Sequence, residues 1–133
     1  MDPVVHFELP YDDRERIVRF YQSVFGWELQ QYGEEMGNYV VATTAKADAK
    51  PGAPAGAIGG GFFPRKADWP AQYPSVVIAV EKIESSMDKV VAAGGKLLGE
   101  PMDIPTVGRY VSFYDTEQNR LSLLQPLPMT GKP

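Results

Sequence analysis

The first clear pattern in the chain is an alternation of apolar and polar residues close to the N-terminus. Val5, Phe7 and Leu9 share one side of an extended segment, whereas His6 shares the other side with Glu8. A period of two residues predicts a β-strand that buries one of its faces in the core. The same alternation places the two titratable side chains together on the second face.

A helix is predicted directly after this strand. Pro10 is expected to end the strand, because proline has no N–H to give to a sheet. Asp12 or Asp13 can cap the helix, and the apolar residues at positions 17, 20, 21 and 24 form one stripe along it. Gly26 is expected to stop the helix by adopting a left-handed conformation.

The rest of the chain divides into short strands, one more helix and polar connections. Further elements are predicted as strands at 27–32, 39–44, 57–63, 75–80, 96–99, 109–114 and 121–125, an extended segment at 102–105, and a helix at 83–91. The Ala/Pro/Lys-rich stretch 45–55 predicts an exposed loop, and 126–133 a frayed tail. Glycines 59–61 would weaken their strand but allow another backbone or a ligand to approach closely.

The same order of elements occurs twice, at an offset of about 69 residues. His6 falls opposite Ser75, and Gly26 falls opposite Gly95. An internal duplication of this kind defines the architecture better than any single element. We therefore predict an α+β fold: one domain over residues 1–133, with two tandem βαβββ repeats at about 4–63 and 75–125 that form a curved mixed sheet. A trough between the two repeats is the expected ligand site.

Composition narrows the class of protein. The 133 residues suit one domain, and the absence of cysteine excludes disulfides and thiolate metal sites. The net charge is −4 with the basic residues scattered, which argues against nucleic-acid binding. No apolar run approaches the roughly 20 residues that span a bilayer, and the start, Met1-Asp2-Pro3, lacks a signal-peptide pattern. These features predict a soluble cytoplasmic protein that does not interact with membranes.

Four segments carry a resemblance to a known family. They lie at residues 5–9, 19–27, 92–96 and 108–119, and include Phe-Tyr-Gln-Ser-Val-Phe-Gly-Trp and the closing turn Asp-Thr-Glu-Gln-Asn. Together with the repeat, they resemble the vicinal oxygen chelate superfamily, which contains glyoxalase I, extradiol dioxygenases, fosfomycin-resistance enzymes and bleomycin-binding proteins. The resemblance extends over residues 4–125 and implies the glyoxalase/bleomycin-resistance fold and a homodimer.

The resemblance also implies four positions for metal ligands, on the first and last strand of each repeat. His6 occupies one of them, Ser75 and Ser122 occupy two more, and the fourth falls within 57–63, which contains no ligating side chain. One imidazole and two hydroxyls are a poor donor set, since transition metals require three or more His, Cys or carboxylate ligands. We expect no metal or other cofactor, although a divalent ion could be recruited through residues of two chains.

Several side chains are candidates for the ligand pocket, and each also has a structural interpretation. The candidates are His6, Glu8, Tyr39, Trp69, Tyr73, Ser75, Arg109, Tyr110 and Ser122. His6 is either a hydrogen-bonding group of the pocket or a structural histidine, and Glu8 either pairs with it or faces solvent. The aromatic residues can form a wall or pack in the core. Arg109 can bind a carboxylate or form a surface ion pair with Asp115 or Glu117.

The sequence and the resemblance are compatible with three functions, and they identify no catalytic residue. The first is a metal-free protein that binds an unidentified small molecule, as in the drug-sequestering branch of the family. The second is a metal-dependent lyase, isomerase or dioxygenase that uses His6 and Glu8. The third is a regulatory subunit whose trough holds a protein partner.

Overall fold

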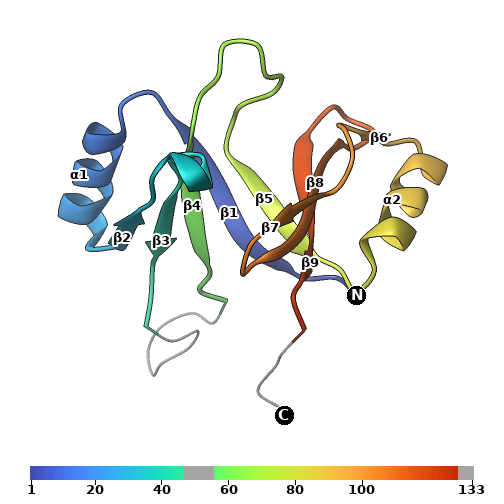
Figure 1. Cartoon of the computed structure of the whole chain (residues 1–133), viewed down its shortest axis with the longest axis horizontal. Helices are drawn as coiled ribbons and strands as arrows, with labels where there is room; N and C mark the ends of the chain where they lie inside the picture. Colours follow the sequence, from blue (N-terminus) through green and yellow to red (C-terminus); the bar gives the residue numbers. More distant parts are fainter. Residues whose placement is uncertain (47–55, 129–133) are drawn as a thin grey trace. The chain divides into compact units, whose positions relative to one another are not determined.

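The computed structural model describes residues 1–46 and 56–128, and it contains two compact units. The N-terminal unit comprises residues 6–74, and the C-terminal unit comprises residues 1–5 together with the chain from 75 onward. These units follow the two predicted repeats, except that the first five residues belong with the second repeat (Figure 1). The predicted loop at 45–55 lies almost entirely outside the described residues.

The N-terminal unit has the predicted order of strand, helix and three strands. Its elements are β1 (Val4–Tyr11), α1 (Arg14–Phe25), β2 (Glu28–Gln31), the 3₁₀ turn η1 (Glu34–Met36), β3 (Val40–Thr43) and β4 (Gly59–Pro64). Its strands lie in the order β2-β3-β4-β1, and β1 runs parallel to β4 with His6 opposite Gly59. The other two pairs are antiparallel, so the sheet is mixed.

The C-terminal unit repeats this topology with one interruption. Its elements are β5 (Ser75–Ala79), α2 (Ile83–Ala92), β6 (Lys96–Leu97), β7 (Met102–Ile104), β8 (Gly108–Tyr114) and β9 (Arg120–Pro126). β5 runs parallel to β9, and β9 is antiparallel to β8. Both β6 and β7 pair with β8, at Phe113–Tyr114 and Gly108–Tyr110 respectively. They are therefore two parts of one strand, divided near Gly99, whose φ of 116° is in the left-handed region.

Pro10 does not end β1, as the sequence suggested, because the strand continues to Tyr11 with Pro10 opposite Phe63. The carbonyl of Tyr11 accepts from the N–H of Arg65 at 2.8 Å, so the backbone polar groups of Tyr11 point toward β4. Those of the preceding residue point to the other edge, since successive residues of a strand alternate. The missing N–H of Pro10 therefore removes no hydrogen bond between β1 and β4.

The ends of α1 agree with the prediction, but its buried face is rotated from the predicted stripe. Asp13 caps the helix by accepting from the N–H of Arg16 at 3.0 Å, and Gly26 is left-handed with φ 72°. Val18 is the buried residue of the helix, whereas Phe20 and Val24 are 52% and 54% exposed. The predicted stripe is therefore wrong at those two positions.

Each helix packs on one face of its own sheet, and the apolar core of each unit lies between them (Figure 1). The core of the N-terminal unit consists of Tyr11, Val18, Val40, Ala42 and Phe62, and that of the C-terminal unit of Val80, Ile83, Val111, Phe113 and Leu123. Because side chains alternate along a strand, the residues between these core positions lie on the opposite face of each sheet. His6 and Glu8 lie there in β1, as do Ser112 in β8 and Ser122 in β9.

Candidate functional site

Three side chains of the N-terminal unit form a connected chain on the face opposite α1. Tyr39 is the residue directly before β3. Its hydroxyl lies 2.9 Å from His6 Nε2 and 2.9 Å from Glu8 Oε2. The rings of His6 and Tyr39 are nearly parallel, at an interplanar angle of 16°. Glu8 is 9% exposed, so it does not face solvent. His6 and Glu8, for which the sequence allowed either a pair or a solvent-facing glutamate, are linked through the phenol of Tyr39.

The hydrogen bonds of this chain have a defined direction. The phenol of Tyr39 has one proton and donates it to the Glu8 carboxylate, which can only accept. The same oxygen can therefore only accept from His6, so Nε2 of His6 must be the protonated ring nitrogen. Burial lowers the pKa of His6 below its ordinary value of 6.5, and the charge of Glu8 opposes this to a smaller extent. The arrangement is a neutral imidazole that donates to a phenol, which donates to a carboxylate.

The close contact between Tyr39 and β4 depends on Gly61. Gly61 lies opposite Glu8 in the parallel pair of β1 and β4. A Cβ at position 61 would overlap with the ring and hydroxyl of Tyr39. On the opposite face of the strand, Gly60 leaves room for the ring of Phe7, since a Cβ there would lie 2.5 Å from that ring. The glycine run thus allows a close approach, but side chains of this unit make it, instead of the backbone or ligand that the sequence suggested.

A second chain of polar groups lies in the C-terminal unit, on the face opposite α2. The hydroxyls of Ser112 and Ser122 are 2.9 Å apart, Ser122 donates to Tyr110 Oη at 2.7 Å, and Arg120 donates to Ser112 at 3.1 Å. Ser122 is 1% exposed and Ser112 is 7% exposed. Because Ser122 gives its single proton to Tyr110, Ser112 must donate to Ser122. The hydrogen bonds therefore run in one direction, from Arg120 to Tyr110.

Sequence reasoning named Tyr110 and Ser122 but missed Ser112 and Arg120. The signal was present, because residues 110, 112 and 114 share one face of β8, and residues 120, 122 and 124 share the same face of β9. The pairing that places Ser112 opposite Ser122 could not be read from either strand alone.

Tyr39 and Tyr110 occupy equivalent positions in the two units. Gly61 pairs with Glu8 on β1 and with Val41 on β3. Ser122 pairs in the same way with Val77 on β5 and with Ser112 on β8. Tyr39 lies two positions before Val41, and Tyr110 lies two positions before Ser112. The duplication therefore places a phenol at the same point of each sheet, over Gly61 in one unit and beside Ser122 in the other.

This equivalence identifies the fourth metal-ligand position implied by the family resemblance as Gly61, the counterpart of Ser122. Three of the four positions then hold one imidazole and two hydroxyls, and the fourth, a glycine, has no side chain. This donor set does not fit a divalent metal. Ser122 is already bonded to two hydroxyls, and the ring of Tyr39 takes the space beside Gly61. Within residues 1–46 and 56–128, no group of three or more His, Asp or Glu could hold a metal ion.

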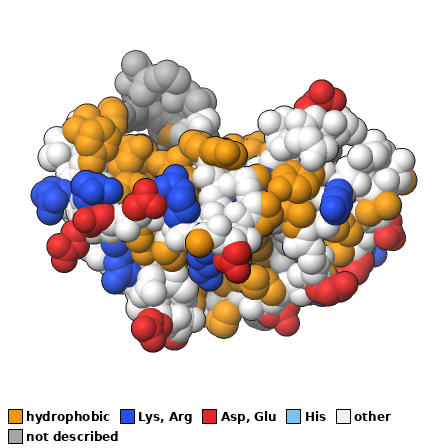
Figure 2. Space-filling view, turned by 90° about the horizontal axis from the view of Figure 1, so that it is seen from above, with side chains coloured by type: hydrophobic (Ala, Val, Ile, Leu, Met, Phe, Trp, Pro, Cys, Tyr) orange, Lys and Arg blue, Asp and Glu red, His pale blue; other side chains and the backbone are white. Residues whose placement is uncertain are grey.

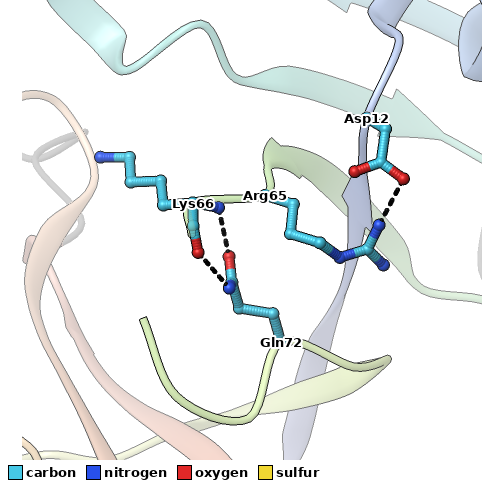
Figure 3. Close-up of polar contacts among 4 residues, drawn as sticks. All are labelled: Asp12, Arg65, Lys66 and Gln72. Carbon is cyan, nitrogen blue, oxygen red and sulfur yellow. Dashed lines mark hydrogen bonds and ion pairs between the residues drawn. The ribbon is translucent and has the colours of Figure 1, made fainter. Parts of the chain in front are cut away.

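Two aromatic candidates, Trp69 and Tyr73, lie on the connection between β4 and β5 and are 45% and 70% exposed. The side chain of Gln72 closes this connection by accepting from the N–H of Lys66 at 2.6 Å and donating to its carbonyl at 2.5 Å (Figure 3). Lys66 Nζ lies 4.4 Å from the centre of the Trp69 ring. No described contact joins Trp69 or Tyr73 to the chain formed by His6, Tyr39 and Glu8.

The start of the same connection is joined to the segment after β1. Arg65 forms an ion pair with Asp12 at 2.6 Å, and Figure 3 shows these two side chains reaching toward each other, apart from the contact between Lys66 and Gln72. Both ends of the ion pair are exposed, so we expect it to contribute little stability. Ser75, another candidate, is a partly buried residue at the beginning of β5.

Arg109 forms a surface ion pair, but with different partners from those expected. Its guanidinium contacts Glu84 of α2 and lies 3.4 Å from Asp103 of β7. Hydrogen bonding to Arg109 lowers the pKa of Glu84. Asp115 instead caps its own turn, since its carboxylate accepts from the N–H groups of Glu117 and Asn119. The predicted ion pair with Asp115 or Glu117 is therefore wrong.

The fold and the sequence define one family. Residues 4–123 match the Glyoxalase/Bleomycin resistance protein/Dioxygenase superfamily, and the chain belongs to this superfamily. The predicted fold class and the resemblance are thereby confirmed. Among the residues that the structure describes, no helix is long and apolar enough to cross a membrane.

Two curated relatives indicate the kind of protein this chain resembles. It is 30% identical over 122 residues to "Putative glyoxylase CFP32" of Mycobacterium tuberculosis, and the match covers 91% of this chain but 43% of that protein. The chain thus spans less than half the length of this relative. It is 28% identical over 115 residues to a glyoxylase-like domain-containing protein of Didymella fabae, with 84% of each covered.

Solved structures share the fold at low sequence identity. Methylmalonyl-CoA epimerase from Mycobacterium tuberculosis has a TM-score of 0.66 at 13% identity, covering 94% of this chain and 88% of that one. A hypothetical protein from Bacillus halodurans C-125 has a TM-score of 0.68 at 12% identity, covering 97% of each chain. These likenesses show the fold alone, because the identities are too low to carry over a substrate.

Proposed function

We propose that this protein binds a small organic molecule without using a metal ion. The observation that carries the proposal is the chain formed by His6, Tyr39 and Glu8, which places three hydrogen-bonding groups on the face of the N-terminal sheet opposite its helix. Burying such groups costs free energy unless they are paired, and a few well-placed polar groups are what orient a ligand in an otherwise apolar pocket. The C-terminal unit presents a comparable chain that includes Ser112, Ser122 and Tyr110.

The surface charge supports a small molecule over a nucleic acid. On the face shown in Figure 2, basic side chains are interspersed with acidic ones instead of forming one extended patch. Phosphate backbones are bound by clustered Lys and Arg, and the net charge of −4 opposes such binding. A homodimer in the cytoplasm remains the expected assembly and location.

Native mass spectrometry of protein purified without chelator or affinity metal tests the proposal. The expected spectrum shows no stoichiometric metal and an additional mass from a retained organic molecule, which is lost in denaturing conditions. His6→Ala and Tyr39→Phe should reduce the retained fraction. Tyr21→Phe is a matched control, since it removes a phenol of α1 on the other face of the sheet in the same unit. A stoichiometric transition metal would contradict the proposal.

A second candidate is an enzyme of the lyase, isomerase or dioxygenase type that recruits a metal through His6 and Glu8. The observation that favours it is the connection of an imidazole to a carboxylate through one phenol, since linked titratable groups are common in acid–base sites. Calorimetric titration with Zn²⁺, Ni²⁺ and Mn²⁺ tests this candidate. Saturable binding that is lost in His6→Ala would support it, and the same weak binding in both proteins would exclude it.

A further inference from the structure

We propose that Nδ1 of His6 is the atom that contacts the ligand, and that it accepts a hydrogen bond from an O–H or N–H group of an uncharged molecule. The inference deepens the proposed function and rests on it. It assigns different tasks to the two ring nitrogens: Nε2 holds the ring to Tyr39, and Nδ1 recognises the ligand.

The first step is the tautomer of His6. Tyr39 gives its only proton to Glu8 at 2.9 Å, so His6 Nε2 donates to Tyr39 and keeps its proton. In a neutral imidazole the second nitrogen then has no proton and is an acceptor. The carboxylate thus determines, through the phenol, which nitrogen of the imidazole can accept a hydrogen bond. Carboxylates orient catalytic and metal-binding histidines in a similar way.

The second step is the environment of Nδ1. Among the residues that the structure describes, none makes a hydrogen bond to this nitrogen. His6 is partly buried. An acceptor without a protein partner on a partly buried ring is a group that a ligand can satisfy. A protonated imidazole would instead be a donor at both nitrogens, so the neutral ring defines the site as an acceptor.

The third step is the chemical class of the ligand. Glu8 is a buried carboxylate connected to His6 through a single phenol, and it makes this part of the face unfavourable for an anion. A carboxylate ligand would also bring only acceptors to a nitrogen that needs a donor, because it is ionised at neutral pH. Alcohols, phenols and amides meet both requirements because they are uncharged and carry a proton to donate.

The test uses the single histidine of the sequence, which gives one imidazole spin system in protein labelled with ¹⁵N-histidine. Long-range ¹H–¹⁵N spectra read the protonation of each ring nitrogen directly. We expect Nε2 protonated and Nδ1 unprotonated in the native protein. A proton on Nδ1 at neutral pH would overturn the inference before any ligand is added.

The probes are phenol, which has an O–H donor, and its methyl ether, anisole, which has none. Phenol is expected to shift the Nδ1 resonance saturably, and anisole at the same concentration to leave it unchanged. Tyr39→Phe should allow both tautomers and weaken phenol binding about twofold, because about half of the population would then present an unprotonated Nδ1. Tyr21→Phe, which removes a phenol of α1 on the other face of the sheet, should behave as the native protein.

The remaining outcomes separate this inference from the proposed function. If phenol shifts backbone amides but not Nδ1, or if anisole moves Nδ1 equally, the inference is wrong. Small-molecule binding would then still stand on the retained mass seen by native mass spectrometry. If phenol produces no shift anywhere in the protein, the proposed ligand class is also wrong.

Discussion

The phenol of Tyr39 lies against the backbone of Gly61, in space that the side chain of any other residue at position 61 would occupy. This contact holds the Tyr39 hydroxyl between His6 and Glu8. It also fills the position at which the family resemblance implies a metal ligand in the first repeat. The absence of a side chain at position 61 is therefore what makes room for the ring of Tyr39.

Gly61→Ala should destabilise the protein by about 1–3 kcal/mol, because the added methyl group displaces the ring of Tyr39. The free energy of unfolding in urea measures this cost. A double-mutant cycle provides the control: in the Tyr39→Ala background the same substitution should cost much less. Equal costs in both backgrounds would show that the ring is not what occupies this space.

The paired hydroxyls of Ser112 and Ser122 should show strong coupling. Ser122→Ala removes the acceptor of Ser112 and the donor to Tyr110, and should cost about 1–3 kcal/mol because buried polar groups lose their partners. Replacing both serines by alanine should cost less than the sum of the two single substitutions. Urea denaturation of the four proteins in this cycle gives the coupling energy, and strict additivity would contradict the directed chain.

Stability should fall as the pH decreases from 7.5 toward 5.5. Burial lowers the pKa of His6 in the folded protein, so the unfolded chain binds a proton at a higher pH, near the ordinary value of 6.5. Below that pH the unfolded state binds more protons, and stability is lost until the pH passes the folded pKa. His6→Gln, which has an amide in place of the imidazole, should have a flatter profile in thermal melts. Identical profiles would contradict a depressed pKa.

Divalent metals should not stabilise the protein. A metal present at 100 times the Kd of a site in the folded protein would raise the free energy of unfolding by about 2.7 kcal/mol. A change of that size is readily seen as a shift in Tm. We expect the Tm to be unchanged by Zn²⁺, Ni²⁺ or EDTA, because the four implied positions hold only one side chain of a kind that commonly binds these metals. A metal-dependent rise in Tm that His6→Ala abolishes would indicate a site assembled with groups beyond these four positions.

Local patterns of the sequence determined the architecture. Hydrophobic periodicity and the repeat of about 69 residues predict two βαβββ units, and the fold and the family both agree. The cap at Asp13 and the left-handed Gly26 were also predictable. The periodicity, the cap and the left-handed glycine depend on residues within a few positions of one another, and the repeat is visible as the same order of elements along the chain, so a single sequence contains the information needed to infer them.

The contacts between distant side chains follow from the folded arrangement of the strands. Tyr39 lies 33 residues from His6 and 31 from Glu8, and it reaches both because β3 and β1 flank β4 at a position where Gly61 leaves room. Arg109 likewise contacts Glu84 of α2 instead of the nearby turn. Such contacts depend on strand register and on the space left by distant residues. Register is set by the packing of the whole unit, and that information is not present in any one segment of the sequence.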